Sequence, residues 1–394
     1  MYKAQTLVLL NAMKFDFNST NTKILDFVTI MAHVYFKDIY TLRSSLKTLD
    51  LNVSVYNPDF WDNKKNQIEK LIKWVSEDNF KLTFISKDDN GEDYQNSFHL
   101  QNSNETSLFS GGLDSLTGAY YNYESQKITD YLGFINKNEE GTNQKIIAKF
   151  YREVFGNNSD IILLDKPSGK KQHYIQATRS LLYLALALFK SHINGTYKVY
   201  LFENGILSLN PEIANRFTTK TTHPKTIYLF NQIIKDIDLR FNVETPFVFQ
   251  TKGEIIHRMN EDFKDQIKHT FTCGQGRTNP KRNHKGQCGI CIPCLLRKIS
   301  LCAFDNESFD CTYHYDYNIK LKDMVEDEYR KDYASNFEYF RSYSEMINSE
   351  SIFNEFEFRA KYYPFDTEYY SKTQSMLLRF SKEFERFEEK YAPY

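Results

Sequence analysis

Residues 106–121, TSLFSGGLDSLTGAYY, place small, hydroxyl and acidic side chains in one short turn between an apolar run and a helical pattern. We call residues 110–115 the glycine turn; its members are Ser110, Gly111, Gly112, Leu113, Asp114 and Ser115. Adjacent glycines weaken either a strand or a helix, so the pair indicates a local need for close backbone approach. Backbone amides at such a turn can bind an anion, and the following helix start adds its positive dipole end. Serine hydroxyls suit phosphate oxygens, and Asp114 suits a magnesium ion carried by a nucleotide.

The glycine turn lacks the Gly-Lys-Ser/Thr ending of a Walker loop. A chance turn is the alternative interpretation, but an apolar strand before it and a helical pattern after it favour a pyrophosphate site. The residues from Ser110 to Ser115 resemble the PP-loop of N-type ATP pyrophosphatases. This resemblance implies that ATP is cleaved between its α and β phosphates, that a substrate oxygen is adenylated, and that AMP and pyrophosphate are released.

Four cysteines form a second group with the spacing C-x14-C-x2-C-x2-C: Cys273, Cys288, Cys291 and Cys294. Zinc prefers four tetrahedral thiolates, and a Cys-x2-Cys turn presents two sulfurs to one ion. In a cytosolic chain this clustering favours metal over disulfides, so we predict a structural zinc ion that holds a polar loop together. His284 is an alternative ligand, although a solvated loop histidine is the simpler interpretation. Cys302 and Cys311 fall outside the spacing and are expected to be buried thiols.

The elements that must position these residues follow a strand-then-helix rhythm from residue 105 to about 250. Strand patterns occur at 107–109, 131–135, 160–164 and 198–202, and helical patterns follow them at 114–124, 142–155, 176–190 and 224–237. This rhythm predicts an α/β fold, a parallel sheet with helices on both faces.

Two further regions flank the expected α/β domain, which we place at residues 105–311 with its zinc-binding insert at 273–294. Residues 1–104 are predicted to form an α+β lobe, with helical spacing, a strand at 80–85 and a hairpin turn or loop after it. Residues 312–394 are predicted to be an aromatic-rich helical region. One helix face there is expected to carry Met376, Leu377, Phe380, Phe384 and Phe387.

Composition narrows the function classes. The 50 basic and 51 acidic residues nearly cancel, so no general attraction to nucleic acid or to an anionic membrane is expected. The longest apolar run, residues 181–189, is too short to span a bilayer, and the N-terminus has no signal-like core. We therefore expect a cytoplasmic protein.

The glycine turn and the cysteine motif together resemble 7-cyano-7-deazaguanine synthase, the QueC family, over about residues 105–305. Three further pieces carry the resemblance: TRSLLYLALAL with Arg179, PFVFQTKGEII with Lys252 and Glu254, and Arg297 after the cysteines. The resemblance implies an adenine nucleotide alpha-hydrolase-like (HUP) fold, with ATP, Mg²⁺ and structural zinc, acting on a deazaguanine. Arg179 and Lys252 would neutralise triphosphate or carboxylate charge; a surface arginine and a helix-start lysine are the alternatives.

The chain departs from the family's pattern near the deazaguanine site. Thr222-His223-Pro224 stands where Tyr-Pro-Asp is expected, and Glu203 and Asn204 follow a strand end. Carboxylate and amide groups suit a guanine-like edge, and His223 is expected to orient substrate or shuttle a proton, unless it is a turn histidine.

These departures and the added length resemble the extended QueC-like proteins of anti-phage systems such as Qat and type IV CBASS. That branch implies C–N bond formation between 7-carboxy-7-deazaguanine and an amine, either ammonia or a protein amine. A housekeeping nitrile synthase, a tRNA-modifying relative and a non-catalytic scaffold remain open alternatives. Support for RNA is limited to the basic insert with Arg277, Lys281, Arg282, His284 and Lys285, and the C-terminal helices leave a homodimer possible.

Overall fold

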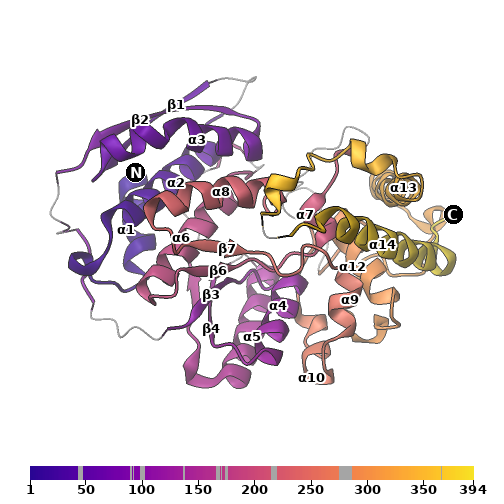
Figure 1. Cartoon of the computed structure of the whole chain (residues 1–394). Coiled ribbons are helices and arrows are strands. Elements are labelled where there is room, and N and C mark those ends of the chain that lie inside the picture. The colour runs from indigo at the N-terminus through magenta and orange to yellow at the C-terminus, as the bar shows by residue number, and fades with distance from the viewer. Residues whose placement is uncertain are drawn as a thin grey trace.

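A five-stranded parallel sheet forms the centre of the computed structural model (Figure 1). The structure describes the chain except for residues 43–47, 89–90, 92, 98–102, 136–137, 166–168, 170, 174–175, 214–219, 275–285 and 365. The strand order is β5-β4-β3-β6-β7. The strands are β3 (Glu105–Leu108), β4 (Thr129–Phe134), β5 (Ile161–Leu164), β6 (Lys198–Tyr200) and β7 (Asn242–Glu244).

Helices cover both faces of this sheet, as the sequence predicted. The helices on one face are α4 (Leu113–Glu124) and α5 (Asn138–Phe155), and those on the other are α6 (Arg179–Ile193) and α8 (Pro224–Ile237). Parallel strands joined by helices bring all carboxyl ends of the strands to one edge, where ligands of such sheets bind. The glycine turn, which follows β3, and Glu203, which follows β6, both lie at this edge.

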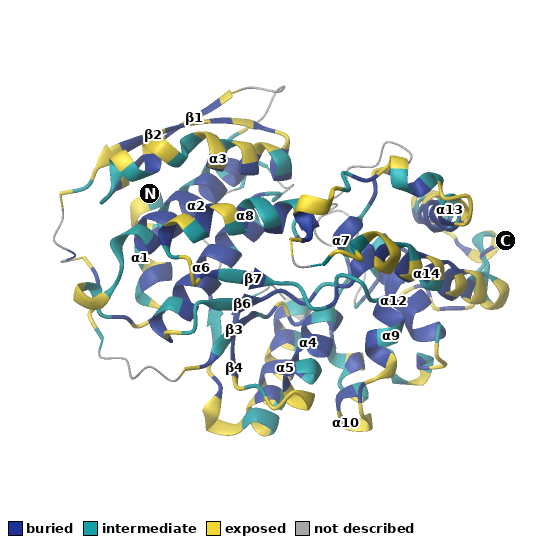
Figure 2. Cartoon of the chain, viewed as in Figure 1, coloured by how far each residue is buried: buried dark blue, intermediate teal, exposed yellow. Residues whose placement is uncertain are grey.

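The N-terminal segment is an α+β unit that packs on α6 and α8. Its elements are α1 (Tyr2–Asn11), α2 (Thr22–Tyr40), β1 (Thr48–Val55), α3 (Pro58–Ser76) and β2 (Asn79–Ser86). β1 and β2 pair in parallel, with Leu51 opposite Leu82. One apolar cluster joins α2 to α6 and α8; within it, the Phe27 and Phe230 rings are 5.4 Å apart (Figure 2).

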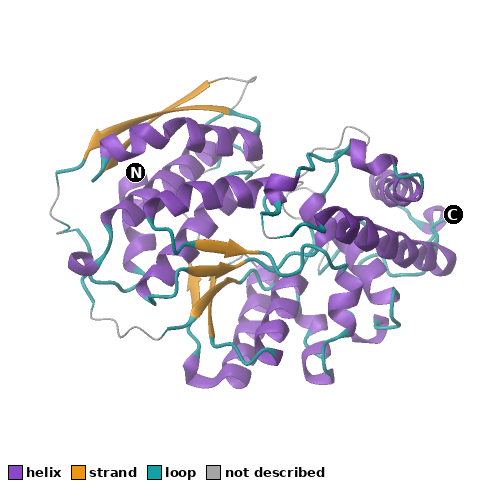
Figure 3. Cartoon of the chain, in the orientation of Figure 1, coloured by secondary structure: helices purple, strands orange, loops and turns teal. Residues whose placement is uncertain are grey.

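The rest of the chain is helical and forms a second body beside the sheet (Figure 3). Its α-helices are α7 (Gly205–Leu209), α9 (Lys252–His257), α10 (Glu261–Lys264), α12 (Ile292–Cys302), α13 (Asp327–Asn348) and α14 (Tyr369–Tyr391). The five apolar residues expected on one face of α14 are all buried. Among the described helices, none has both the length and the apolar character needed to cross a membrane.

Short 3-10 helices connect these elements. They are η1 (Phe17–Ser19), η2 (Gly156–Asn158), η4 (Ile267–His269), η5 (Glu307–Phe309), η6 (Leu321–Asp323), η7 (Ser351–Asn354) and η8 (Ala360–Tyr362).

Candidate functional site

Two serines brace the glycine turn from inside. The Ser110 amide donates to Ser115 Oγ over 3.0 Å, the two hydroxyl oxygens are 2.9 Å apart, and the Gly112 amide donates to Ser110 Oγ over 3.2 Å. Gly111 has φ +78°, and a Cβ added to it would lie 2.9 Å from the Cβ of Gln144 on α5. Glycine is therefore required there both by backbone conformation and by space. Because the first amides of a helix have no partner within it, the start of α4 remains available to an anion.

Asp114, at the start of α4, lies among polar groups from two other elements. Its Oδ2 is 2.7 Å from Lys252 Nζ, and its Oδ1 accepts from Asn204 Nδ2 over 3.1 Å. Asn204 is fully buried, and its own Oδ1 accepts from the Leu207 amide and so caps α7. The Lys252 side chain is 3% exposed and that of Asp114 is 18% exposed, so the ion pair is shielded yet open on the side of the carboxylate.

Glu203 joins the same cluster as a neutral acid. Burial raises the pKa of Glu203 well above its ordinary range, and the charge of Asp114 raises it further, while Lys252 opposes the shift. The protonated carboxyl of Glu203 hydrogen-bonds to Asp114, and Asn204 Nδ2 lies 3.4 Å from its Oε1. The expected contact of Glu203 and Asn204 with substrate stays a prediction; for Asn204, both side-chain termini already have partners in the protein.

Lys252 is the first residue of α9. Thr251 caps that helix: its hydroxyl accepts from the Glu254 amide over 3.2 Å, and Glu254 Oε2 accepts from the Thr251 amide over 2.9 Å. This capping box fixes the direction in which the backbone enters α9 and hence where the Lys252 side chain begins.

Arg179, the first residue of α6, is linked to the end of β4 through Tyr183, whose ring stacks on that of Phe134 at 4.2 Å. Its guanidinium carbon lies 5.5 Å from the centre of the Tyr183 ring, and Tyr183, Tyr35 and Glu140 raise its pKa. Glu140 lies one helical turn before Gln144 on α5, and Gln144 packs against the glycine turn. Side chains four residues apart on a helix are neighbours, about 5–6 Å apart at Cβ. The N-terminal half of α5 thus links Arg179 to the glycine turn.

His223 has the contacts of a helix cap. Its Nδ1 accepts from the Lys225 amide over 3.1 Å at the start of α8, and its ring packs edge-on against Trp74 at 5.2 Å. Burial lowers the pKa of His223 to about 3, and the positive charge of Lys225 adds to the shift. The ring is therefore neutral at neutral pH. A role for His223 toward substrate stays a prediction.

The four cysteines of the motif come together. The Sγ atoms of Cys273, Cys288, Cys291 and Cys294 all lie within 4.8 Å of one another, and all four residues are buried. Zinc–sulfur bonds of about 2.3 Å in a tetrahedron place sulfurs about 3.8 Å apart, so the cluster fits a zinc ion. Hydrogen bonds from the other three thiols hold the pKa of Cys273 well below its usual range. The basic insert and His284 lie outside the described residues.

The cysteine cluster is attached to the glycine turn. The Phe271 amide, two residues before Cys273, donates to the Gly111 carbonyl over 3.2 Å. Arg297, which is fully buried, holds the preceding chain: it donates to the carbonyls of Ile267 and Thr270 over 2.8 and 3.0 Å and pairs with Asp310 at 2.7 Å. A metal ion at the cysteines would thus stiffen the segment that supports the turn.

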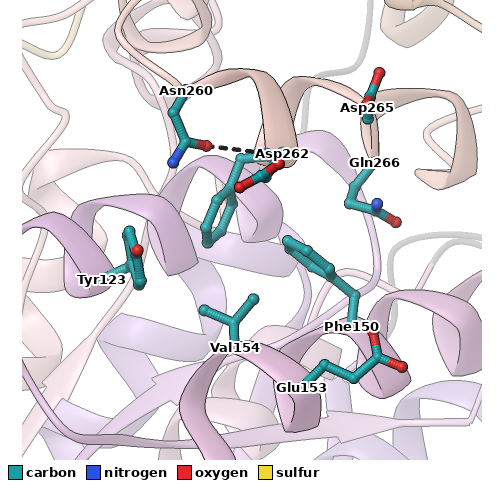
Figure 4. A pocket seen from close by; sticks show the side chains of 9 residues that line it. Tyr123, Phe150, Glu153, Val154, Asn260, Asp262, Asp265 and Gln266 are labelled. Atoms are coloured by element: carbon teal, nitrogen blue, oxygen red, sulfur yellow. Dashed lines mark hydrogen bonds between the residues drawn. The ribbon is translucent and has the colours of Figure 1, made fainter.

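A separate hollow of about 370 Å³ lies between α4, α5 and α10 (Figure 4). Its lining includes three aromatic and three acidic side chains: Tyr123, Phe150, Phe263, Glu153, Asp262 and Asp265. Tyr123 is nine residues after Asp114 on α4, about 13 Å along the helix axis. The three carboxylates that line the hollow would repel phosphates, so the hollow is not the candidate nucleotide site.

Three residues that support the site were not anticipated: Thr251, Gln144 and Glu383. Thr251 carried a readable signal, because Thr-x-x-Glu before a helix is the pattern of a capping box, and its partner Glu254 was already singled out by the motif. Gln144 and Glu383, which contacts Thr251, had no local signal, since they reach the site only through the packing of α5 and α14.

Comparison with known proteins gives one family match. Residues 219–305 match the family model described as Queuosine biosynthesis protein QueC. No curated protein matches the chain. The matched residues contain His223, Lys252 and the cysteine cluster, whereas Asp114 and Arg179 lie outside them; the Lys252–Asp114 contact joins the two parts. The resemblance expected from the motifs is therefore confirmed over residues 219–305, where the chain is QueC-like.

Proposed function

We propose that this chain is a QueC-like, ATP-dependent enzyme that adenylates a deazaguanine carboxylate and joins it to an amine. The observation that carries the proposal is the 2.7 Å pair between Asp114 in the glycine turn and Lys252 in the QueC-like segment. It places an acid, an ammonium and the helix-start amides together at the carboxyl edge of a parallel sheet.

The chemistry divides between these groups. The carboxylate oxygen of 7-carboxy-7-deazaguanine attacks the α-phosphorus of ATP, the bond from that phosphorus to the bridging oxygen breaks, and pyrophosphate leaves. The first amides of α4 bind the leaving pyrophosphate, and Lys252 neutralises phosphate charge. Arg179 binds the negative charge on the substrate side. Bound at Asp114, a magnesium ion would supply further charge neutralisation on the phosphates.

The second step forms the C–N bond. An amine nitrogen attacks the acyl carbon of the adenylate, AMP leaves, and the nitrogen loses a proton. We propose a protein amine as acceptor, as in the extended anti-phage branch, with ammonia as the alternative. The support is the added length of residues 1–104 and 312–394, which lie outside the region of about residues 105–305 that resembles the QueC family.

The test measures AMP and pyrophosphate. Purified protein is incubated with ATP, Mg²⁺, 7-carboxy-7-deazaguanine and either ammonia or the proteins encoded beside it, and the acceptors are analysed by mass spectrometry. Asp114→Asn is expected to lower AMP release by about 100-fold or more, the typical loss of a key electrostatic group. Asp50→Asn, an exposed acid on β1, is the matched control and should leave the rate unchanged. Release that is absent, or that does not depend on the deazaguanine, contradicts the proposal.

A further inference from the structure

We infer that Glu383, on the C-terminal helix α14, is a positioning residue that fixes Lys252 against Asp114. The role of Lys252 toward phosphate rests on the proposed function, but the placement of Lys252 does not. α14 lies outside the QueC-like segment, 131 residues after Lys252 (383 − 252). The inference therefore assigns to α14, where the sequence shows no functional motif, a role in positioning a residue of the site.

Three contacts attach α14 to the residues that surround Lys252. The Thr251 hydroxyl donates to Glu383 Oε1, so the cap of α9 is itself held by α14. Arg379 Nη2 donates to the Phe249 carbonyl over 3.1 Å, and Arg379 Nε is 2.5 Å from Glu254 Oε1. Both halves of the capping box that begins α9 thus depend on side chains of α14.

The start of α9 packs closely against Glu383. A Cβ added to Gly253, the residue after Lys252, would lie 2.7 Å from Glu383 Oε1 and 3.0 Å from the Cβ of Ala303. A side chain at position 253 would therefore crowd both Glu383 and the residue that follows α12, and glycine avoids this. Because Lys252 lies between Thr251 and Gly253, a shift of Glu383 would move the lysine backbone directly.

The protonation state of Glu383 suits this role. Its side chain is 6% exposed, and within the described chain Oε2 has no hydrogen-bond partner. Burial raises the pKa of Glu383 to about 8; the hydrogen bond from Thr251 lowers it, Glu254 raises it and Arg379 lowers it. Lys382 and Arg386 line the adjacent hollow of about 310 Å³. Near neutral pH the residue is mostly a neutral acid, whose shape and hydrogen bonding glutamine reproduces.

The test compares Glu383→Ala with the conservative Glu383→Gln and with Glu389→Gln, an exposed control on the same helix. The first readout is modification of Lys252 by an amine-selective reagent, located by mass spectrometry. The second is MgATP affinity by calorimetry. Loss of one hydrogen bond corresponds to about fivefold, so E383A should raise Lys252 modification and weaken MgATP binding by about that factor at pH 7. E383Q and E389Q should match the wild type.

Two outcomes separate the inference from the proposed function. If the wild type binds no MgATP, the proposed function fails, and Lys252 modification still tests the position of the lysine. If E383A is folded and its Lys252 is modified at the wild-type rate, the inference is overturned. Should E383A fail to fold, Thr251→Val removes the same hydrogen bond from the other side, and unchanged modification in T251V overturns the inference equally.

Discussion

At the scale of single residues, Glu383 is a carboxylic acid whose burial opposes ionisation. Its pKa rises from 4.5 to about 8, so the folded chain keeps a proton that the unfolded chain releases between these pH values. The free energy of unfolding therefore falls as pH rises from about 4.5 to about 8, and the loss is complete above that range. The group stabilises the fold only under acidic conditions.

Replacing Glu383 by glutamine should remove this pH dependence. We expect E383Q to be more stable than the wild type at pH 8, by on the order of 4 kcal/mol, because one pKa unit corresponds to about 1.4 kcal/mol. The difference should shrink toward pH 5. Urea denaturation at pH 5, 7 and 8 measures it, with E389Q as the control. A wild-type protein whose stability equals that of E383Q at pH 8 would show that the carboxyl is not buried as described.

The sequence predicted the residues that belong to short contiguous motifs. It did not predict the residues that reach the site through tertiary packing. The glycine turn and the cysteine cluster were predictable, because each is a contiguous pattern with one chemical purpose. The contact between Asp114 and Lys252 was not predictable, because 138 residues separate them in the sequence. Only the tertiary packing of α4 and α9 brings the two side chains together. Nor could neighbouring residues alone reveal that the Asn204 side chain caps α7 and donates to Asp114; its contact with substrate stays a prediction.

At the scale of elements, α2 holds the loop that leads into α6. Asp38 on α2 is fully buried; its carboxylate accepts from the Thr178 amide and hydroxyl over 3.2 and 2.6 Å and lies 3.1 Å from His173 Nδ1. The Ile39 carbonyl accepts from the amides of Gln172 and His173. The N-terminal segment thereby sets the position of the first turn of α6, where Arg179 lies.

Replacing Asp38 by alanine should destabilise the protein by about 2–4 kcal/mol, because it leaves buried donors of Thr178 without an acceptor. Chemical denaturation of D38A beside D50A, which removes an exposed carboxylate from β1, measures this difference. Equal midpoints for the two variants would mean that the loop before α6 does not depend on α2.

The predicted zinc site at the cysteine cluster can be tested by measuring bound metal. Wild-type protein should contain about one zinc ion per chain, as four thiolates bind one ion, and a chelator should lower the melting temperature. Cys288→Ser should lose the metal, whereas Cys302→Ser, a buried thiol outside the cluster, should keep it. Elemental analysis decides; equal zinc in both variants, or none in the wild type, contradicts a zinc site.

The strand-and-helix rhythm predicted the main elements because each strand of a parallel sheet is an apolar run followed by an amphipathic helix. The parallel partner of β2 was missed, although residues 48–55 alternate between buried and exposed positions as a half-buried strand does. β7 has three residues, too few to give any periodic signal.

At the scale of the whole molecule, the two flanking regions pack around the QueC-like segment and the sheet. The N-terminal segment shares an apolar cluster with α6 and α8, and the C-terminal helices share one with the cysteines and α12. Boundaries at residues 104 and 311 stay predictions, and these shared cores argue that the flanks stabilise the sheet and its site together. Each flanking region contacts the residue that precedes one of the two basic side chains. α2 contacts Thr178, before Arg179, and α14 contacts Thr251, before Lys252.

The central claim is that the glycine turn binds the phosphates of ATP beside Lys252. A crystal structure of the full chain with Mg²⁺ and an α,β-methylene analogue of ATP tests it most directly. The account predicts the β and γ phosphates against the first amides of α4, with the Lys252 ammonium on a phosphate oxygen and the metal ion on Asp114. Phosphates bound elsewhere on the chain, with the Asp114–Lys252 pair intact at 2.7 Å and the turn empty, would contradict it.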